Sequence, residues 1–239
     1  GPSRGGPRGG RRSSIVHRVE TDRQEWERAL GELAVGVAAT PGEGRPRLVG
    51  PASAPPPGAA FIPPCPLELL GDASFRRLHG VRYACLAGAM ANGIASVELV
   101  EAMGRAGMLG IFGAAGLAVD AVERAVDRVQ SGLGDKSPYG FNLIHSPQEP
   151  AIESAVVDLY LRRGVRLVEA SAFLKLTPSV VRYRVAGIHR DERGRVVTPN
   201  RVIAKASRVE VASRFLAPPP EKMLRELVEQ GAVTADQAA

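Results

Sequence analysis

The fold is decided by the stretch Val81-Arg-Tyr-Ala-Cys-Leu-Ala-Gly-Ala-Met-Ala-Asn-Gly-Ile-Ala-Ser96. Its first half is a short apolar run that ends at Gly88, which predicts a strand covered on both faces. Its second half ends at Ser96, whose hydroxyl is suited to cap a helix that starts at Val97. The stretch therefore predicts one unit of strand, loop and helix, with small residues where the strand leaves the sheet.

Four more units of the same kind follow along the chain. Apolar strands are predicted to start near residues 108, 139, 165 and 201, and a segment with helical periodicity follows each of them. Strands that alternate with helices indicate an α/β fold with a parallel sheet. Both an open doubly wound sheet and a TIM-type (β/α)₈ barrel fit this pattern, and the pattern alone does not separate them.

The part of the chain before these units has a different composition. Residues 1–14 are rich in Gly and Arg and are predicted to be a disordered tail, and residues 15–65 are predicted to hold a helix over 19–38 and a Pro-rich connector over 40–64. Residues 66–239 then form the predicted main domain. Apolar residues make up 44% of the chain, which is enough for a sizeable core.

Charge and cysteine usage exclude several classes of protein. The formal net charge is +6, but the basic tail is not continued by interleaved aromatic residues, so no nucleic acid is expected as a partner. Cys65 and Cys85 form neither a disulfide framework nor a metal-binding spacing, and Cys85 is predicted to pack in the core. The sequence also lacks an apolar run long enough to span a membrane, so we expect a cytoplasmic protein.

Small residues mark the exit of the first predicted strand. Gly88, Ala89, Met90 and Ala91 would let a flat ring lie against exposed main chain at the carboxyl end of a parallel strand, where ligands bind in both candidate folds. The alternative is that they only allow close packing of strand and helix. The glycines near residues 104–116 do not have the order of a dinucleotide-binding fingerprint, which follows a strand and opens a helix.

Polar side chains interrupt three later strands or their exits. Asn142 offers donors and an acceptor at the third strand, and His145 follows that strand as a candidate proton donor, although a single His is often structural. Glu169 and Lys205 interrupt the fourth and fifth strands. They are interpreted either as a structural ion pair or as a lysine that stabilises negative charge on a reduced flavin.

Five segments together resemble the trans-acting enoylreductases of polyketide and polyunsaturated fatty acid synthases, a family similar to 2-nitropropane dioxygenases. They are Val81–Ser96, Met108-Leu-Gly-Ile-Phe-Gly-Ala-Ala-Gly116, Tyr139-Gly-Phe-Asn-Leu-Ile-His-Ser-Pro147, Val168-Glu-Ala-Ser-Ala-Phe173 and Asn200-Arg-Val-Ile-Ala-Lys205. The resemblance extends from about residue 66 to the last residue. It implies an FMN-binding (β/α)₈ barrel.

The resemblance also implies an activity and a set of site residues. Members reduce the α,β-double bond of an enoyl chain on an acyl carrier protein, with NADPH supplying the hydride through the flavin. Cofactor binding is expected from Gly88, Ala89, Met90, Ala91, Asn142, Glu169 and Lys205. Catalytic roles are expected for His145 and Lys205. No metal is expected.

Family members continue beyond the length of this chain. Their further half carries a Gly-Gly-His stretch and the phosphate-binding loops, so we expect this chain to form about five βα units of the barrel and a second half, in the same or another chain, to complete it. A homodimer is possible. Two other functions stay open: a nitronate monooxygenase with the same flavin and fold, and a non-catalytic half-barrel that serves as a docking module.

Overall fold

The computed structural model describes residues 23–32, 34–42, 44–51, 57–134 and 137–239. The chain divides into two compact units, Gly1–Leu70 and Gly71–Ala239. The tail predicted over residues 1–14 lies outside the described residues. Among the described residues, no helix has both the length and the apolar character needed to cross a membrane.

The first unit contains a small antiparallel sheet, which the sequence analysis did not predict. Residues 23–31 are helical, and the strands β1 (Val37–Thr40), β2 (Arg47–Pro51) and β3 (Ala60–Ile62) pair in the order β2-β1-β3. The 3-10 helix η1 (Leu67–Leu69) follows.

The helix predicted over residues 19–38 is present over 23–31 but ends before Val37, and the predicted connector over 40–64 contains two strands. Val37 and Ala38 are buried in the central strand, where both neighbours bond to their backbone. Strand pairing on two sides outweighs a helical preference that Gly31 and Gly36 already weaken. Pro51 stands at the end of an edge strand, where a missing N–H costs little.

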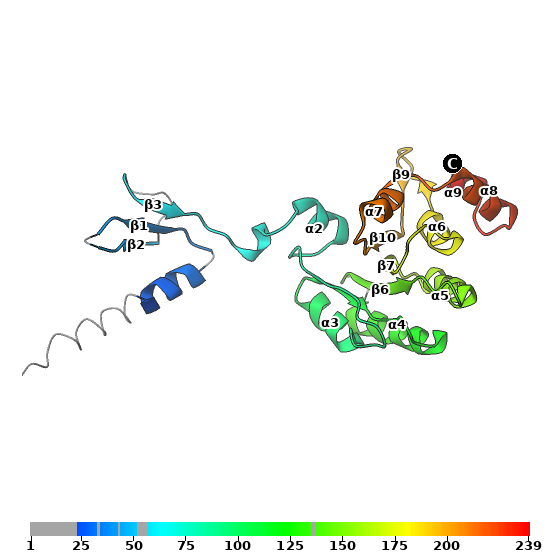
Figure 1. Cartoon of the computed structure of the whole chain (residues 1–239), viewed down its shortest axis with the longest axis horizontal. Helices are drawn as coiled ribbons and strands as arrows, with labels where there is room; N and C mark the ends of the chain where they lie inside the picture. Colours follow the sequence, from blue (N-terminus) through cyan, green and yellow to red (C-terminus); the bar gives the residue numbers. More distant parts are fainter. Residues whose placement is uncertain (1–22, 33, 43, 52–56, 135–136) are drawn as a thin grey trace, which may run out of the picture. The chain divides into compact units, whose positions relative to one another are not determined.

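The second unit is built on a five-stranded parallel sheet (Figure 1) with the order β10-β7-β6-β5-β4. Its strands are β4 (Leu86–Ala87), β5 (Leu109–Phe112), β6 (Tyr139–Ile144), β7 (Leu167–Ser171) and β10 (Arg201–Ala204). Its helices are α2 (Ala73–His79), α3 (Val97–Arg105), α4 (Val119–Leu133), α5 (Pro150–Arg162), α6 (Pro178–Val185), α7 (Val209–Leu216), α8 (Glu221–Glu229) and α9 (Ala235–Ala238). The predicted alternation of strand and helix is confirmed.

The first strand is shorter than predicted. Only Leu86 and Ala87 pair with β5, while the N–H groups of Arg82 and Tyr83 both donate to the carbonyl of Gly107. Cys85 is exposed, so the prediction of a packed thiol was wrong. The reason is that residues 81–85 form a loop beside an edge strand and not a strand covered on both faces.

The sheet buries both of its faces, in two different ways. Its outer face packs against the helices, which form an arc outside the strands in Figure 1, and this is the larger core. Its inner face carries a small cluster of Val81, Leu109, Ile111 and Leu167, against which Phe75 of α2 and Ile203 pack. Side chains alternate along each strand, so inner and outer residues follow one another.

One connection contains a second unpredicted feature. Residues 189–197 form a hairpin between α6 and β10, with β8 (His189–Arg190) paired to β9 (Val196–Val197). Residues 191–195 join these two strands. Both strands are short and largely exposed, so they leave no hydrophobic pattern in the sequence.

Candidate functional site

The main chain of Ala89, just beyond β4, is held by two side chains from distant strands. The N–H of Ala89 donates to both carboxylate oxygens of Glu169 at 3.2 and 3.3 Å. The Nζ of Lys205 donates to the carbonyl of Ala89 at 2.9 Å and lies 2.5 Å from Oε1 of Glu169. Glu169, Lys205 and Ala89 thus form a closed arrangement of complementary charge and dipoles.

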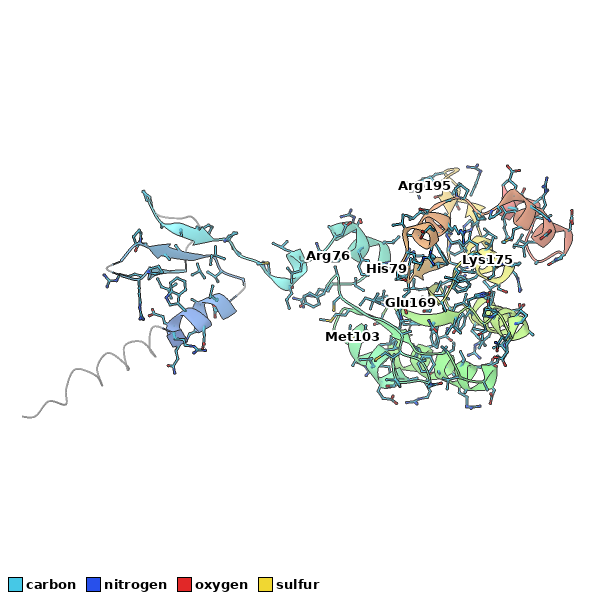
Figure 2. All side chains as sticks on the ribbon, viewed as in Figure 1. Arg76, His79, Met103, Glu169, Lys175 and Arg195 are labelled. Carbon is cyan, nitrogen blue, oxygen red and sulfur yellow. The ribbon has the colours of Figure 1, made fainter. Side chains whose placement is uncertain are left out.

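This contact requires a curled sheet. Glu169 belongs to β7, and β5 and β6 lie between β7 and β4 in the strand order. A side chain of ordinary length cannot cross two intervening strands of a flat sheet, which are spaced about 4.8 Å apart. Glu169, labelled in Figure 2, therefore projects from a curved sheet into the interior that the strands enclose.

The burial of Glu169 makes its partners essential. The side chain is 1% exposed, whereas that of Lys205 is 46% exposed. A buried carboxylate without a counter-charge is strongly destabilising, so the ammonium group and the N–H of Ala89 are what allow it there. Lys205 keeps half of its surface open at the carboxyl end of the strands, where a ligand could meet it.

Two glycines leave room for this arrangement. A Cβ on Gly88 would lie 3.1 Å from Oε2 of Glu169, so a larger residue would push the carboxylate away. A Cβ on Gly113, beyond β5, would lie 1.6 Å from the carbonyl oxygen of Met90, which excludes any side chain there. The exits of β4 and β5 therefore approach each other through main chain alone.

The loop after β4 is held by its own hydrogen bonds. The carbonyl of Met90 accepts from the N–H of Ala95 at 3.2 Å, and that of Ala91 accepts from the N–H of Ile94 at 3.1 Å. Asn92 adopts a left-handed conformation with φ of 56°. Within the described residues, the N–H groups of Met90 and Ala91 have no acceptor. The loop thus offers two donors at the carboxyl end of the strand.

Asn142 lies on the same face of the sheet as Glu169. Its amide nitrogen donates to the main-chain carbonyl of Glu169 at 3.0 Å and to the hydroxyl of Ser171 at 2.8 Å. Its own carbonyl accepts from the Tyr160 hydroxyl at 2.7 Å, and burial raises the pKa of that phenol well above its ordinary value, so it remains a donor. These bonds fix the amide and leave its side-chain oxygen without a hydrogen bond to the described residues.

His145 faces a different environment. Its Nδ1 lies 2.8 Å from Oε2 of Glu153 on α5, and its ring stacks on Phe173 with centroids 5.2 Å apart. The other oxygen of Glu153 accepts from the hydroxyl of Thr177, the residue that caps α6. Because residues 139, 141 and 143 of β6 face the helices, the ring of His145 continues that outer row and lies between the sheet and the helices.

The sequence is similar to components of polyunsaturated fatty acid and polyketide synthase systems. No family model matches the chain. The chain is 49% identical over 180 residues to a component of the polyunsaturated fatty acid synthase of Thraustochytrium sp., and 47% identical over 171 residues to polyketide biosynthesis protein PksE of Bacillus subtilis. These matches cover 75% and 72% of this chain but 12% and 22% of those proteins, so the chain spans less than a quarter of either relative.

A solved structure from a related biosynthetic system has a similar fold. The enoyl reductase domain of MlnA, from the macrolactin biosynthesis cluster of Bacillus amyloliquefaciens, superposes with a TM-score of 0.68 and 41% identity over 71% of this chain and 39% of that chain. Over about three quarters of its length the chain is similar to components of polyketide and polyunsaturated fatty acid synthases and to a solved enoyl reductase domain. Its five strands are accordingly part of a (β/α)₈ barrel and not an open doubly wound sheet.

Within this half-barrel, most of the predicted site residues come together. Ala89, Glu169 and Lys205 are in direct contact, Gly88 leaves room for the carboxylate, and Asn142 is joined to Glu169 through the main chain. One detail differs from the expectation. The N–H and C=O of Ala89, which were expected to face a flavin, are occupied by Glu169 and Lys205, so Met90 and Ala91 carry the N–H groups that remain open. His145 is not part of this group.

Three residues that contact the predicted site residues or their partners were missed by the sequence analysis. Glu153 contacts His145 and accepts from the hydroxyl of Thr177, and Ser171 accepts from the amide of Asn142. A signal for Glu153 does exist in the sequence. It lies one helical turn before Val156 and Val157 and two turns before Tyr160, on the buried side of α5, where a carboxylate requires a partner.

Proposed function

We propose that this protein is an FMN-dependent enoyl reductase that acts in trans on enoyl thioesters carried by an acyl carrier protein, with NADPH as the source of hydride. The observation that carries the proposal is the half-exposed ammonium group of Lys205, fixed at the carboxyl end of the barrel strands beside the open main chain of Met90 and Ala91. The names of the relatives support the same reaction, because MlnA contains an enoyl reductase domain.

The residues present fit an FMN ring. The ring is flat and carries carbonyl oxygens and nitrogens along one edge, so it needs main-chain donors, a polar amide and no bulky side chain in the way. The exits of β4 and β5 supply main chain without bulk, since a Cβ on Gly113 would collide with Met90. Asn142 and Lys205 supply the polar groups on the inner face.

Each residue then has a defined role in the proposed reaction. Bound FMN would supply hydride transfer from NADPH to the enoyl β-carbon. Lys205 holds positive charge where the reduced ring would become negative, and Glu169 fixes the position of that charge while sharing it with Ala89. Gly88 through Ala91 and Asn142 position the ring, and they require no proton transfer to do so.

The geometry favours Lys205 over His145 for a catalytic role. His145 is held by Glu153 and Phe173 on the helix side of the sheet, whereas Lys205 lies on the inner side with the remaining site residues. We therefore propose that His145 positions the loop after β6. The proton donor to the enoyl α-carbon is then a group other than His145.

Two measurements on the full-length protein test the proposal. A visible absorption scan should show bound flavin, and stopped-flow mixing should show bleaching by NADPH followed by reoxidation by a crotonyl thioester. Absence of flavin would contradict the proposal. Rapid oxidation of a nitronate by molecular oxygen, without reduction of any thioester, would assign the protein to the nitronate monooxygenase alternative instead.

A further inference from the structure

Charged side chains are distributed unevenly over the loops at the carboxyl ends of the strands. The loops after β4 (residues 88–96) and β5 (residues 113–118) contain no charged residue, and the loop after β6 (residues 145–149) contains one, Glu149. The loops after β7 and β10 are basic, with Lys175 in the first and Lys205 and Arg208 in the second. Because β7 and β10 are neighbours, these cations lie side by side on one sector of the rim.

Lys205 is paired with Glu169, but the other two cations of this sector, Lys175 and Arg208, are at most weakly neutralised. Lys175, labelled in Figure 2, has no carboxylate within 4 Å among the described residues. Arg208 lies 3.5 Å from Glu210, and both side chains are about two-thirds exposed. A surface pair of this kind contributes little and leaves the guanidinium available to another anion.

Apolar groups accompany the charges. Leu174 is 63% exposed and Val209 is 80% exposed, and they stand next to Lys175 and Arg208 in the chain. Arg214 of α7 donates to the carbonyl of Leu174, which joins the loop after β7 to α7. We call the surface made by Leu174, Lys175, Arg208 and Val209 the basic rim. Because it is braced by Arg214, it is formed in the absence of a partner.

We propose that the basic rim is the docking surface for an acidic acyl carrier domain, an inference that rests on the proposed function. Pantetheine is joined to a carrier by a phosphodiester, so the point of attachment is anionic and is best received by cations with an exposed apolar contact between them. The basic rim adjoins Lys205, whose ammonium group contacts Ala89. A carrier seated there would place the root of its arm at the mouth of the site.

A comparison of three substrates on the full-length, flavin-loaded protein tests this. The substrates are a crotonyl group on an acyl carrier protein, on coenzyme A and on N-acetylcysteamine, and the variant is Lys175→Glu with Arg208→Glu. We expect the KM for the carrier-bound substrate to rise about tenfold at low salt, with kcat retained and most of the salt dependence lost. The KM for the N-acetylcysteamine thioester should not change.

The matched control is Arg193→Glu with Arg225→Glu. Both arginines are exposed and, among the described residues, neither forms an ion pair, so the change in net charge is the same but the basic rim is intact. Unchanged KM values in this control would support a local effect. A rise as large as that of the rim variant would overturn the proposal.

The remaining outcomes separate the docking surface from the proposed function. If the unmodified protein reduces all three thioesters and the rim variant still handles the carrier-bound one normally, the docking surface is wrong and the function stands. An equal rise for coenzyme A and carrier would mean a phosphate site without carrier recognition, which also overturns the proposal. If no thioester is reduced by the unmodified protein, the function itself fails.

A milder variant, Lys175→Gln with Arg208→Gln, keeps the test open if the charge-reversed variant does not fold. It should give a smaller rise in the KM for the carrier-bound substrate.

Discussion

Two buried carboxylates lie on opposite sides of one sheet. Both require partners for their charge, but the partners differ in what else they can do. Glu169 lies on the inner face and Glu153 on the helix side, and both are almost completely buried. Each is satisfied by a cationic or ionisable partner and by one neutral donor. For Glu169 these are Lys205 and the N–H of Ala89, and for Glu153 they are His145 and the hydroxyl of Thr177.

The two carboxylates differ in how far their partner side chains are exposed to solvent. Lys205 is half exposed at the carboxyl end of the strands, so the charge that satisfies Glu169 is also presented to a ligand. The partners of Glu153 are enclosed between the sheet and α5 and α6, and they join three segments of the chain. A buried charge is therefore informative about function only when its counter-charge reaches an open surface.

The largest effect is expected from the replacement of Lys205. Lys205→Met would leave Glu169 buried without a counter-charge, and we expect a loss of about 3 kcal/mol in the free energy of unfolding. In the proposed reaction, flavin reduction by NADPH should slow by about a hundredfold, because the positive charge proposed to lie at the ring is lost. Chemical denaturation and stopped-flow absorbance measure the two effects.

The double variant Lys205→Met with Glu169→Gln separates the effect on stability from the effect on flavin reduction. Glutamine is neutral and still offers an acceptor to the N–H of Ala89, so most of the stability should return while flavin reduction stays slow. Recovery of the reduction rate together with the stability would mean that Lys205 has a purely structural role.

The second effect concerns the carboxylate on the helix side. Glu153→Ala should lower the free energy of unfolding by about 2 kcal/mol, because His145 and Thr177 lose a buried acceptor. Flavin reduction should remain near that of the unmodified protein, and Thr177→Val serves as a milder control. A reduction rate that falls while stability is retained would place His145 in the catalytic machinery.

A smaller effect is expected from Gly88→Ala. Its Cβ would lie 3.1 Å from Oε2 of Glu169, so the carboxylate must shift, and we expect a loss of about 1 kcal/mol in stability and weaker flavin binding. Gly31→Ala is the matched control, because a Cβ there meets nothing within 4 Å. Equal behaviour of the two variants in thermal unfolding and flavin titration would contradict the close approach at β4.

The smallest effect comes from His79, a third buried ionisable side chain, which has no carboxylate partner within 4 Å among the described residues. Burial and, to a lesser extent, the charge of Arg201 hold the pKa of its imidazole below the ordinary 6.5. Its neutral form is thus favoured in the folded protein, so stability is complete above pH 6.5 and falls as the pH drops below that value. His79→Leu should flatten this part of the stability profile, and an unchanged slope would contradict the assignment.

The sequence predicted the barrel elements well because each is encoded locally. The strands β5, β6, β7 and β10 begin within two residues of the predicted starts, and a helix follows each of them as the hydrophobic periodicity predicts. The cap predicted at Ser96 is confirmed by a hydrogen bond from the N–H of Leu99 to its hydroxyl. The segments that were missed, β1 to β3 and the β8–β9 hairpin, are short, and their apolar pattern is weak.

The site was predicted only in part, for the same reason. Glu169 and Lys205 stand out because a charge inside an apolar strand requires a partner. Their contact with Ala89 follows from the curl of the sheet, which brings β7 and β10 towards an exit that is several strands away in the strand order. The partnership of His145 with Glu153 likewise depends on how α5 packs against β6, and local pattern does not specify that.

Local pattern was sufficient for the order of strands and helices, for the small residues at the exits and for the charged residues that interrupt strands, since these depend on neighbours along the chain. The resemblance of five such segments then indicated the family. The pairing of each buried charge and the identity of the open main-chain groups depend on distances across the barrel, which arise when a curved sheet brings remote residues together. Hence Lys205 faces the interior and His145 faces the helices, although each stands at or just beyond the end of a strand in the sequence.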